Sequence, residues 1–174
     1  MNQIIQPQNW PSFMSIIEAK YYDDKGNCLY EDHNLPNIWH TEGQQFMLSL
    51  AFDTSAGFSV PTNYYLGLDN RATLDVDDTL AILEDEPSSN GYARQAVNSS
   101  TGFNIGFDNG KLKAVTGVCT FVATGGAWGP VKNLFLATTI DNSGILIASV
   151  PLSTTQTTTS GNSFTVRVGL ALSR

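Results

Sequence analysis

Hydrophobic and polar residues alternate most regularly near the C-terminal end of the chain. Five apolar residues occupy every second position there: Phe164, Val166, Val168, Leu170 and Leu172. Successive side chains of a strand point to opposite faces of a sheet. The pattern therefore predicts a strand over residues 164–172, with Val166, Val168 and Leu170 pointing into the core.

Shorter segments of strand-like sequence follow one another from residue 12 onward, and turn-forming residues such as Asp23–Asn27 and Asn109-Gly110 separate them. The further strands predicted are residues 12–22, 28–31, 64–68, 92–97, 103–107, 112–123, 131–138 and 144–150. The Thr- and Ser-rich stretch 153–163 is expected to be a connection. Eight or nine short strands without a βαβ pattern predict an all-β fold, a jelly-roll-like antiparallel β-sandwich.

One segment has helical spacing instead. Phe46, Met47, Leu50 and Ala51 recur on one face of a helix. Thr41 and Gln44 stand three residues apart, as in a capping box, where the Thr hydroxyl accepts from a backbone N–H and the Gln side chain reaches back. The sandwich is therefore expected to carry one N-terminal α-helix that begins near Thr41.

The chain has 174 residues, which is the usual size of one domain. Residues 1–11 are polar apart from Ile4, Ile5 and Trp10, and we expect them to form an N-terminal arm before a single β-sandwich domain, residues 12–174. These three apolar residues would then contact a neighbouring subunit, either by strand addition or by insertion of Trp10 into a pocket. The alternative is an arm that folds against its own domain.

Charge excludes several classes of partner. The net charge is −7, and only 14% of residues are charged. This composition disfavours binding to nucleic acid and to anionic membranes, which both require clustered Lys and Arg. An apolar run long enough to span a membrane and a secretory signal are both absent from the sequence. Cys28 and Cys119 are therefore expected to be free thiols of a protein made in the cytoplasm.

Catalytic and metal chemistry find little support. His33 and His40 match neither a hydrolase triad nor a zinc-site spacing. Asp75, Asp77 and Asp78 are the only plausible cation-binding group, but they lack the spacing of an EF-hand loop, and a solvated acidic surface is the favoured interpretation. We therefore predict no enzyme activity, no cofactor and no metal.

Two further residue groups deserve a structural interpretation. Arg94 follows a tight turn shortly after Glu86, and a guanidinium there can form an ion pair with this carboxylate and hold the preceding connection to the sheet. Trp128 lies in a Gly- and Pro-lined loop, a setting in which aromatic residues often serve binding. Trp128 is therefore a candidate interface residue, and Glu86 with Arg94 a candidate structural ion pair.

The chain from about residue 30 to residue 174 resembles a family of small bacteriophage virion proteins, often labelled tail-fibre or head-decoration proteins. The most specific stretch is Gly91-Tyr92-Ala93-Arg94-Gln95. Further matching segments are residues 64–68, 78–80, 86–90, 120–124, 128–131, 134–137, 144–146 and 160–164. The resemblance implies a β-sandwich, frequently a jelly roll, on the outside of a virion, with no catalytic residues to carry over.

The function expected first is that of a capsid decoration or cement protein. As a homotrimer it would clamp neighbouring subunits of the major capsid protein, and it would be found in the virion after synthesis in the cytoplasm of the host bacterium. The alternatives are a tail or neck fibre component that binds a host receptor, and a carbohydrate-binding module. A host-surface glycan is a possible partner in these alternatives, since exposed aromatic residues stack on sugars.

Overall fold

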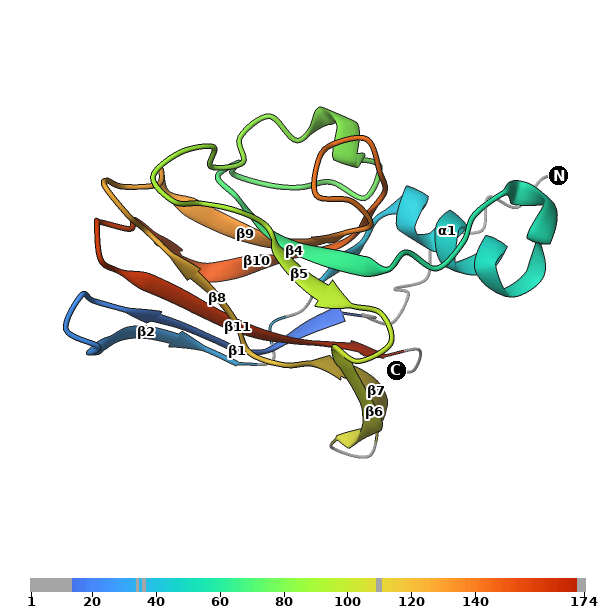
Figure 1. Cartoon of the computed structure of the whole chain (residues 1–174), viewed down its shortest axis with the longest axis horizontal. Coiled ribbons are helices and arrows are strands. Elements are labelled where there is room, and N and C mark those ends of the chain that lie inside the picture. The colour runs from blue at the N-terminus through green and yellow to red at the C-terminus, as the bar shows by residue number, and fades with distance from the viewer. Residues whose placement is uncertain (1–13, 34, 36, 109–110, 172–174) are drawn as a thin grey trace, which may run out of the picture.

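The structure, a computed structural model, describes residues 14–33, 35, 37–108 and 111–171. Two antiparallel sheets pack face to face, and one α-helix, α1 (Thr41–Phe52), lies at an end of the sandwich (Figure 1). The first sheet contains β1 (Met14–Tyr22), β2 (Cys28–Asp32), β6 (Phe103–Asp108), β7 (Lys111–Thr116), β8 (Cys119–Val122) and β11 (Ser163–Ala171). The second contains β3 (Ile38–Trp39), β4 (Asn63–Asp69), β5 (Gln95–Asn98), β9 (Val131–Ala137) and β10 (Leu146–Gln156). The predicted all-β sandwich is confirmed.

Strands from the two ends of the chain lie next to each other. The first sheet has the order β2-β1-β11-β7-β6, with β8 also paired to β11, and the second has the order β3-β10-β9-β4-β5. Strand β1 pairs with β11 from Met14 opposite Leu170 to Tyr22 opposite Ser163. Strand β3 pairs with β10 in the same antiparallel sense. Along the sequence, the paired strands β3 and β10 both lie between the paired strands β1 and β11. This nested order of strand pairs is what makes the sandwich jelly-roll-like.

The main core lies between the two sheets. Phe164, Val166 and Val168 of β11 are fully buried there, as the alternation predicts, whereas Leu170 is half-buried because it lies at an open end of the sandwich. A second apolar cluster lies on the other side of β9. It contains Leu74, Leu80, Leu83, Phe135, Ala137 and Leu146, where the 3-10 helix η2 (Leu80–Ile82) supplies Leu80. Strand β9 is thus covered on both faces, which explains its nearly continuous apolar sequence.

The helix begins at Thr41 as expected, but the predicted capping box does not form. His40 occupies the N-cap position, and no side chain caps the helix there. The Thr41 hydroxyl donates to Asp77 Oδ1 at 2.7 Å, and Gln44 Nε2 donates to the Trp39 carbonyl oxygen at 2.9 Å. Thr41 is already the first helical residue, one position past the cap, so its hydroxyl is used for a tertiary contact.

Three strand boundaries differ from the sequence expectation. The predicted strand 112–123 is two strands, β7 and β8, which pair with successive parts of β11 and are separated at Gly117 and Val118. Strand β10 continues to Gln156, into the Thr- and Ser-rich stretch. Strand β5 begins at Gln95 rather than at Tyr92, because the preceding residues belong to a buried junction described below. In the described residues, no helix is long and apolar enough to cross a membrane.

Candidate functional site

Arg94 lies at a junction of two segments that are distant in the sequence, residues 86–94 and residues 139–142. Its side chain is 3% exposed, and its Nη2 lies 2.5 Å from Glu86 Oε2, while Nε donates to both carboxylate oxygens of Glu86. Nη1 donates to the carbonyl oxygens of Thr139 (3.0 Å) and Asp141 (2.6 Å), and Nη2 also donates to Asn142 Oδ1. The predicted pair is therefore in contact, and it fastens the connection before β5 to the loop after β9.

A half-buried tyrosine completes this junction. The Tyr92 hydroxyl donates to Glu86 Oε1 at 2.7 Å and accepts from the backbone N–H of Leu68 at 2.7 Å. Burial raises the pKa of Tyr92 well above its ordinary value of 10.0, and the neighbouring Glu86 carboxylate raises it further. The hydroxyl therefore stays protonated and remains a donor. The Arg94 guanidinium, the Glu86 carboxylate and the Tyr92 hydroxyl all form hydrogen bonds within the protein, and these bonds stabilise the fold.

Trp128 requires a correction, because it is a core residue. Its side chain is 2% exposed, and it packs edge-on against Tyr92 at 5.7 Å between ring centroids. Its Nε1 donates to the carbonyl oxygen of Asn90, and its backbone N–H donates to Thr158 Oγ1. The Gly- and Pro-lined loop turns the Trp128 ring inward, so the ring has almost no exposed surface that a partner could contact. Ile4, Ile5 and Trp10, the other candidate interface residues, lie outside the described residues.

The acidic residues of the cation hypothesis are engaged in local structure. Asp77 accepts from Thr41, and Asp78 Oδ2 accepts from the backbone N–H of Asp75 at 2.8 Å. Arg71 Nη1 lies 3.8 Å from Asp78 Oδ2. In the part of the chain that the structure describes, no three His, Cys, Asp or Glu residues are grouped so that they can hold a metal ion.

The two histidines occupy different environments. His33 is exposed, with its Nε2 2.7 Å from Glu31 Oε1. His40 is buried, and its Nε2 lies 2.8 Å from Ser149 Oγ on β10. Burial lowers the pKa of His40 below its ordinary value of 6.5. Cys28, on β2, is exposed and Cys119, on β8, is half-buried, and both are free thiols.

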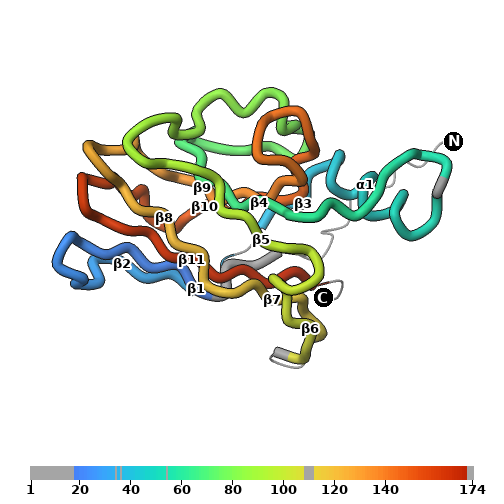
Figure 2. Tube along the Cα trace, viewed as in Figure 1, coloured from blue at the N-terminus to red at the C-terminus, as the bar shows by residue number. Residues whose placement is uncertain are grey.

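The hairpin of β6 and β7 presents an apolar face to solvent. The register pairs Ile105 with Ala114 and Phe107 with Leu112. Ile105, Leu112 and Ala114 face a cavity that the second sheet also lines, whereas Phe107 borders the concavity that contains Arg167. The hairpin projects beyond the body of the sandwich, where the second sheet does not cover it (Figure 2). Ile105, Phe107 and Leu112 are consequently 71%, 80% and 52% exposed.

An apolar cavity opens beside this face. It has a volume of about 560 Å³ and lies between the two sheets, with Ile105 and Leu112 of the hairpin in its wall. Other wall residues come from several elements: Trp39, Met47, Tyr64, Phe103 and Leu170. The cavity and the exposed side chains of Ile105 and Leu112 form one apolar surface, which we call the hairpin groove. Contiguous exposed apolar surface is a common feature of interaction sites.

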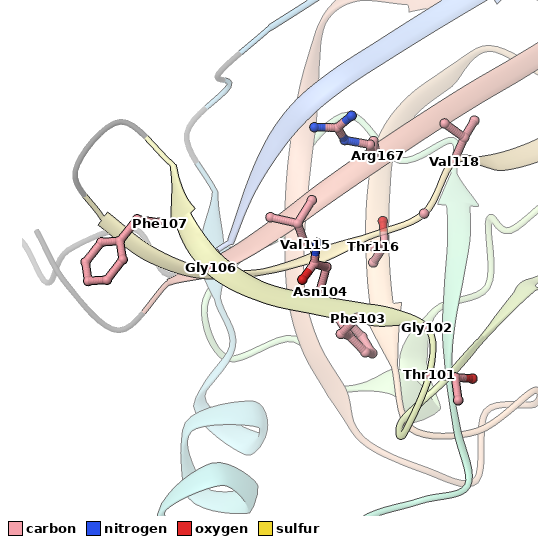
Figure 3. A pocket seen from close by; sticks show the side chains of 11 residues that line it. Thr101, Gly102, Phe103, Asn104, Gly106, Phe107, Val115, Thr116, Val118 and Arg167 are labelled. Atoms are coloured by element: carbon pink, nitrogen blue, oxygen red, sulfur yellow. The ribbon is translucent and has the colours of Figure 1, made fainter.

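A second concavity, of about 800 Å³, has a mixed polar and apolar lining that includes Asn104, Val115 and Arg167 (Figure 3). Asn104 and Val115 are paired on β6 and β7, and Arg167 follows on β11, close to the point where β7 ends and β8 begins. The Nε atom of Arg167 is buried and has no hydrogen-bond partner among the described residues. Because Nε is buried, a ligand in this concavity would contact the terminal nitrogens of the guanidinium, which suit an acidic or hydroxylated group.

Comparison with known proteins identifies the family. Residues 40–172 match the family described as podophage GP4 fiber I protein gp80, and this span covers about three quarters of the chain. The chain belongs to this family. No curated protein matches it. Membership of the gp80 fibre family places the chain among the structural proteins of phage virions, so the resemblance to virion proteins is confirmed at this level.

The part of the chain matched by the gp80 fibre family contains the Arg94 junction, the Arg167 concavity and the hairpin groove apart from Trp39. It begins at His40, the N-cap of α1, and therefore leaves out β1, β2 and β3. Strand β1 is nevertheless a central strand of the first sheet, between β2 and β11. The N-terminal 39 residues thus supply a necessary part of the sandwich as well as the segment before β1.

Sequence reasoning missed the hairpin groove. Phe103, Ile105 and Phe107 alternate with other residues in the sequence, and this pattern is the same for a covered and an uncovered face. The deciding fact is that the second sheet ends before the hairpin does, which depends on the relative lengths of strands far apart in the chain. Two residues of the pattern, Phe107 and Leu112, flank the predicted Asn109-Gly110 turn, which places them far out on the hairpin.

Proposed function

We propose that the chain is a structural component of a phage tail fibre and that it acts by binding other virion proteins. The observation that carries this proposal is the match of residues 40–172 to a podophage fibre family. Capsid decoration, which the sequence suggested first, would use the same kind of sandwich, but the family description favours the fibre. The role of the fold is then to hold exposed binding surfaces rigidly.

The hairpin groove supports a binding role. A lone domain of this size has a radius of gyration of roughly 16 Å. One such domain is much too short to form a fibre, so a fibre built from it requires contacts between domains. The groove is the largest apolar surface described above, and interfaces between stable partners have apolar centres with little charge.

Location in the particle tests this function. Gold-labelled antibody against the chain, viewed by electron microscopy on intact virions, should mark the tail side of the particle. Purified capsids that lack tails provide the control and should carry none of the protein after sedimentation. Label spread over the capsid faces, together with co-sedimentation with tailless capsids, would show that the chain is a decoration protein instead.

A second candidate function is the binding of a host-surface glycan, favoured by the Arg167 concavity. An acidic sugar offers carboxylate and hydroxyl oxygens that match the guanidinium and the Asn104 amide. A glycan array probed with the chain should give signals for acidic glycans, and Arg167→Met should lose them. Binding that is equal in Arg167→Met and the wild type would remove this concavity as the site.

A further inference from the structure

We propose that the hairpin groove receives the N-terminal segment, residues 1–13, of a neighbouring copy of this chain. The proposal adds to the proposed fibre function the contact by which copies of the chain assemble. It rests on that function only in requiring that several copies assemble. The occupant follows from the shape and chemistry of the groove, from the composition of the segment, and from the place where the segment joins the fold.

The groove offers both side-chain and backbone contacts. Ile105 and Leu112 supply exposed apolar area. Strand β6 has β7 as its only neighbour among the described strands, so its outer edge has unpaired backbone groups. Its sequence, Phe-Asn-Ile-Gly-Phe-Asp, contains none of the Lys or Pro residues that protect edge strands from pairing. The edge is therefore suited to the addition of a strand from another chain.

The N-terminal segment has a matching composition. Residues 1–13 contain no Asp, Glu, Lys or Arg, although they include five large apolar residues: Met1, Ile4, Ile5, Trp10 and Phe13. Pro7 and Pro11 restrict strand addition to the residues before Pro7, which include Ile4 and Ile5. Each copy carries a net charge of −7, so copies repel one another at long range. An uncharged segment on an apolar groove makes a contact in which this repulsion is smallest. A cavity of about 560 Å³ has room for large side chains from this segment.

The segment also begins at the right place. It joins the described fold at Met14, which lies opposite Leu170 of β11, and Leu170 is part of the cavity wall. Thirteen extended residues span up to about 43 Å. This length allows the segment to leave one copy beside its own groove and to reach the groove of the next. Each contact joins the segment of one copy to the groove of another, so the assembly closes as a reciprocal dimer or a larger ring, or continues along a fibre.

Cross-linking between two single-cysteine variants tests the proposal directly. Both variants carry Cys28→Ser and Cys119→Ser, which remove the two native thiols; one adds Ile5→Cys and the other Ile105→Cys. A mixture treated with a short bismaleimide should give a covalent dimer on a denaturing gel, and neither variant alone should give as much. A chain that carries both substitutions and cross-links only at the mass of one chain would overturn the proposal, because its segment would occupy its own groove.

Association of the full chain provides an independent measurement. Deletion of residues 1–13 and the substitution Ile105→Ser should each weaken self-association by about tenfold or more in sedimentation velocity runs, as loss of a central apolar contact does. Ile140→Thr, which alters an exposed isoleucine outside the groove, is the matched control and should associate like the wild type. Circular dichroism should show that each variant is folded, which the high exposure of Ile105 favours.

The outcomes separate the proposal from the fibre function. A wild-type chain that stays monomeric, or variants that associate like the wild type, would overturn the proposal, even if electron microscopy places the protein on the tail. Conversely, a contact in solution between the segment of one copy and the groove of another would remain valid if the label marked the capsid, and only the fibre function would then fail.

Discussion

Arg94 joins the connection before β5 to the loop after β9 by hydrogen bonds at all three guanidinium nitrogens. Its guanidinium carbon also lies 5.0 Å from the ring centroid of Phe135, so the cation is enclosed by protein on several sides. Breaking such a buried pair leaves the partner carboxylate, here Glu86, without a counter-charge.

Arg94→Ala should therefore lower the free energy of unfolding by about 3–5 kcal/mol, measured by urea denaturation. Arg94→Lys should lower it by less, because the charge remains although the planar fork is lost. Lys25→Ala, at an exposed turn, is the control and should change stability by less than about 0.5 kcal/mol. Equal stability of Arg94→Ala and the wild type would mean that the junction does not support the fold.

His40 gives the fold a pH-dependent stability. Burial favours the neutral form of the His40 imidazole and so lowers its pKa, and the charge of Arg71 lowers the pKa further. Asp78 and the backbone carbonyl groups of Asp75 and Val76 raise the pKa, but by less. Because the pKa is lowered in the fold, the unfolded chain binds a proton below about pH 6.5 that the folded chain does not bind. The contribution of His40 to the free energy of unfolding is therefore fully present above pH 7, and it is lost as the pH falls from 6.5 toward the lowered pKa.

His40→Gln should remove this part of the pH dependence, so that its unfolding free energy falls less than that of the wild type between pH 7 and acidic pH. Denaturant titrations at a series of pH values measure the difference. His33→Gln, which alters the exposed histidine, should keep the wild-type slope. A wild-type slope in His40→Gln would show that other groups cause the decline.

Individual residues also show what sequence alone can predict. Glu86 and Arg94 are close in sequence with opposite charges, so their contact is predictable from local information. The burial of Trp128 is not, because its ring is enclosed by Tyr92 and its Nε1 bonded by Asn90, both more than 30 positions away. A loop rich in Gly and Pro can turn an aromatic ring outward or inward, and only the tertiary fold decides which.

At the scale of elements, α1 is held against β10 by close contact at Gly43. A Cβ atom at this position would collide with the backbone carbonyl of Ile147. This contact explains a glycine inside a helix, where alanine is ordinarily more stable by roughly 1 kcal/mol.

Gly43→Ala should accordingly destabilise the protein, by about 1–3 kcal/mol, in spite of the higher helix propensity of alanine. Thermal unfolding followed by circular dichroism measures this change. Gly106→Ala on β6, where an added Cβ meets open space, is the control and should unfold close to the wild-type temperature. A stabilised Gly43→Ala would indicate that α1 is not packed closely on β10.

Most elements were predictable from local patterns, and the errors have a common cause. Alternation located β11, and turn residues separated β1 from β2. The break between β7 and β8 was hidden because both segments have strand-like sequence and the break exists only in their pairing with β11. Strand β3, two residues long, depends on β10 for its definition and has no pattern of its own.

At the scale of the whole molecule, the family-matched region is incomplete as a fold. Without residues 1–39, β11 loses the strand β1, with which it shares a ladder from Met14–Leu170 to Tyr22–Ser163. The buried side chains of β1, such as Ala19 and Tyr21, would also leave the core.

A fragment of residues 40–172 should therefore show no cooperative thermal transition and should have poorly dispersed amide signals in NMR spectra. A fragment of residues 14–171 is the matched control and should unfold cooperatively, because it contains every described strand. A cooperative transition in the 40–172 fragment would mean that β1 is dispensable for the sandwich.

The pairing of β1 with β11 also determines how the molecule responds to tension. Met14 lies opposite Leu170, so the two described ends of the chain emerge at the same end of this strand pair. A force that pulls these ends apart separates the strands one hydrogen bond after another, since the bonds of an antiparallel pair are perpendicular to the strands. A force applied by neighbours bound to the faces of the sandwich instead acts on many contacts at the same time. A subunit with this topology bears mechanical load well when it is gripped by its surfaces and poorly when it is pulled by its termini.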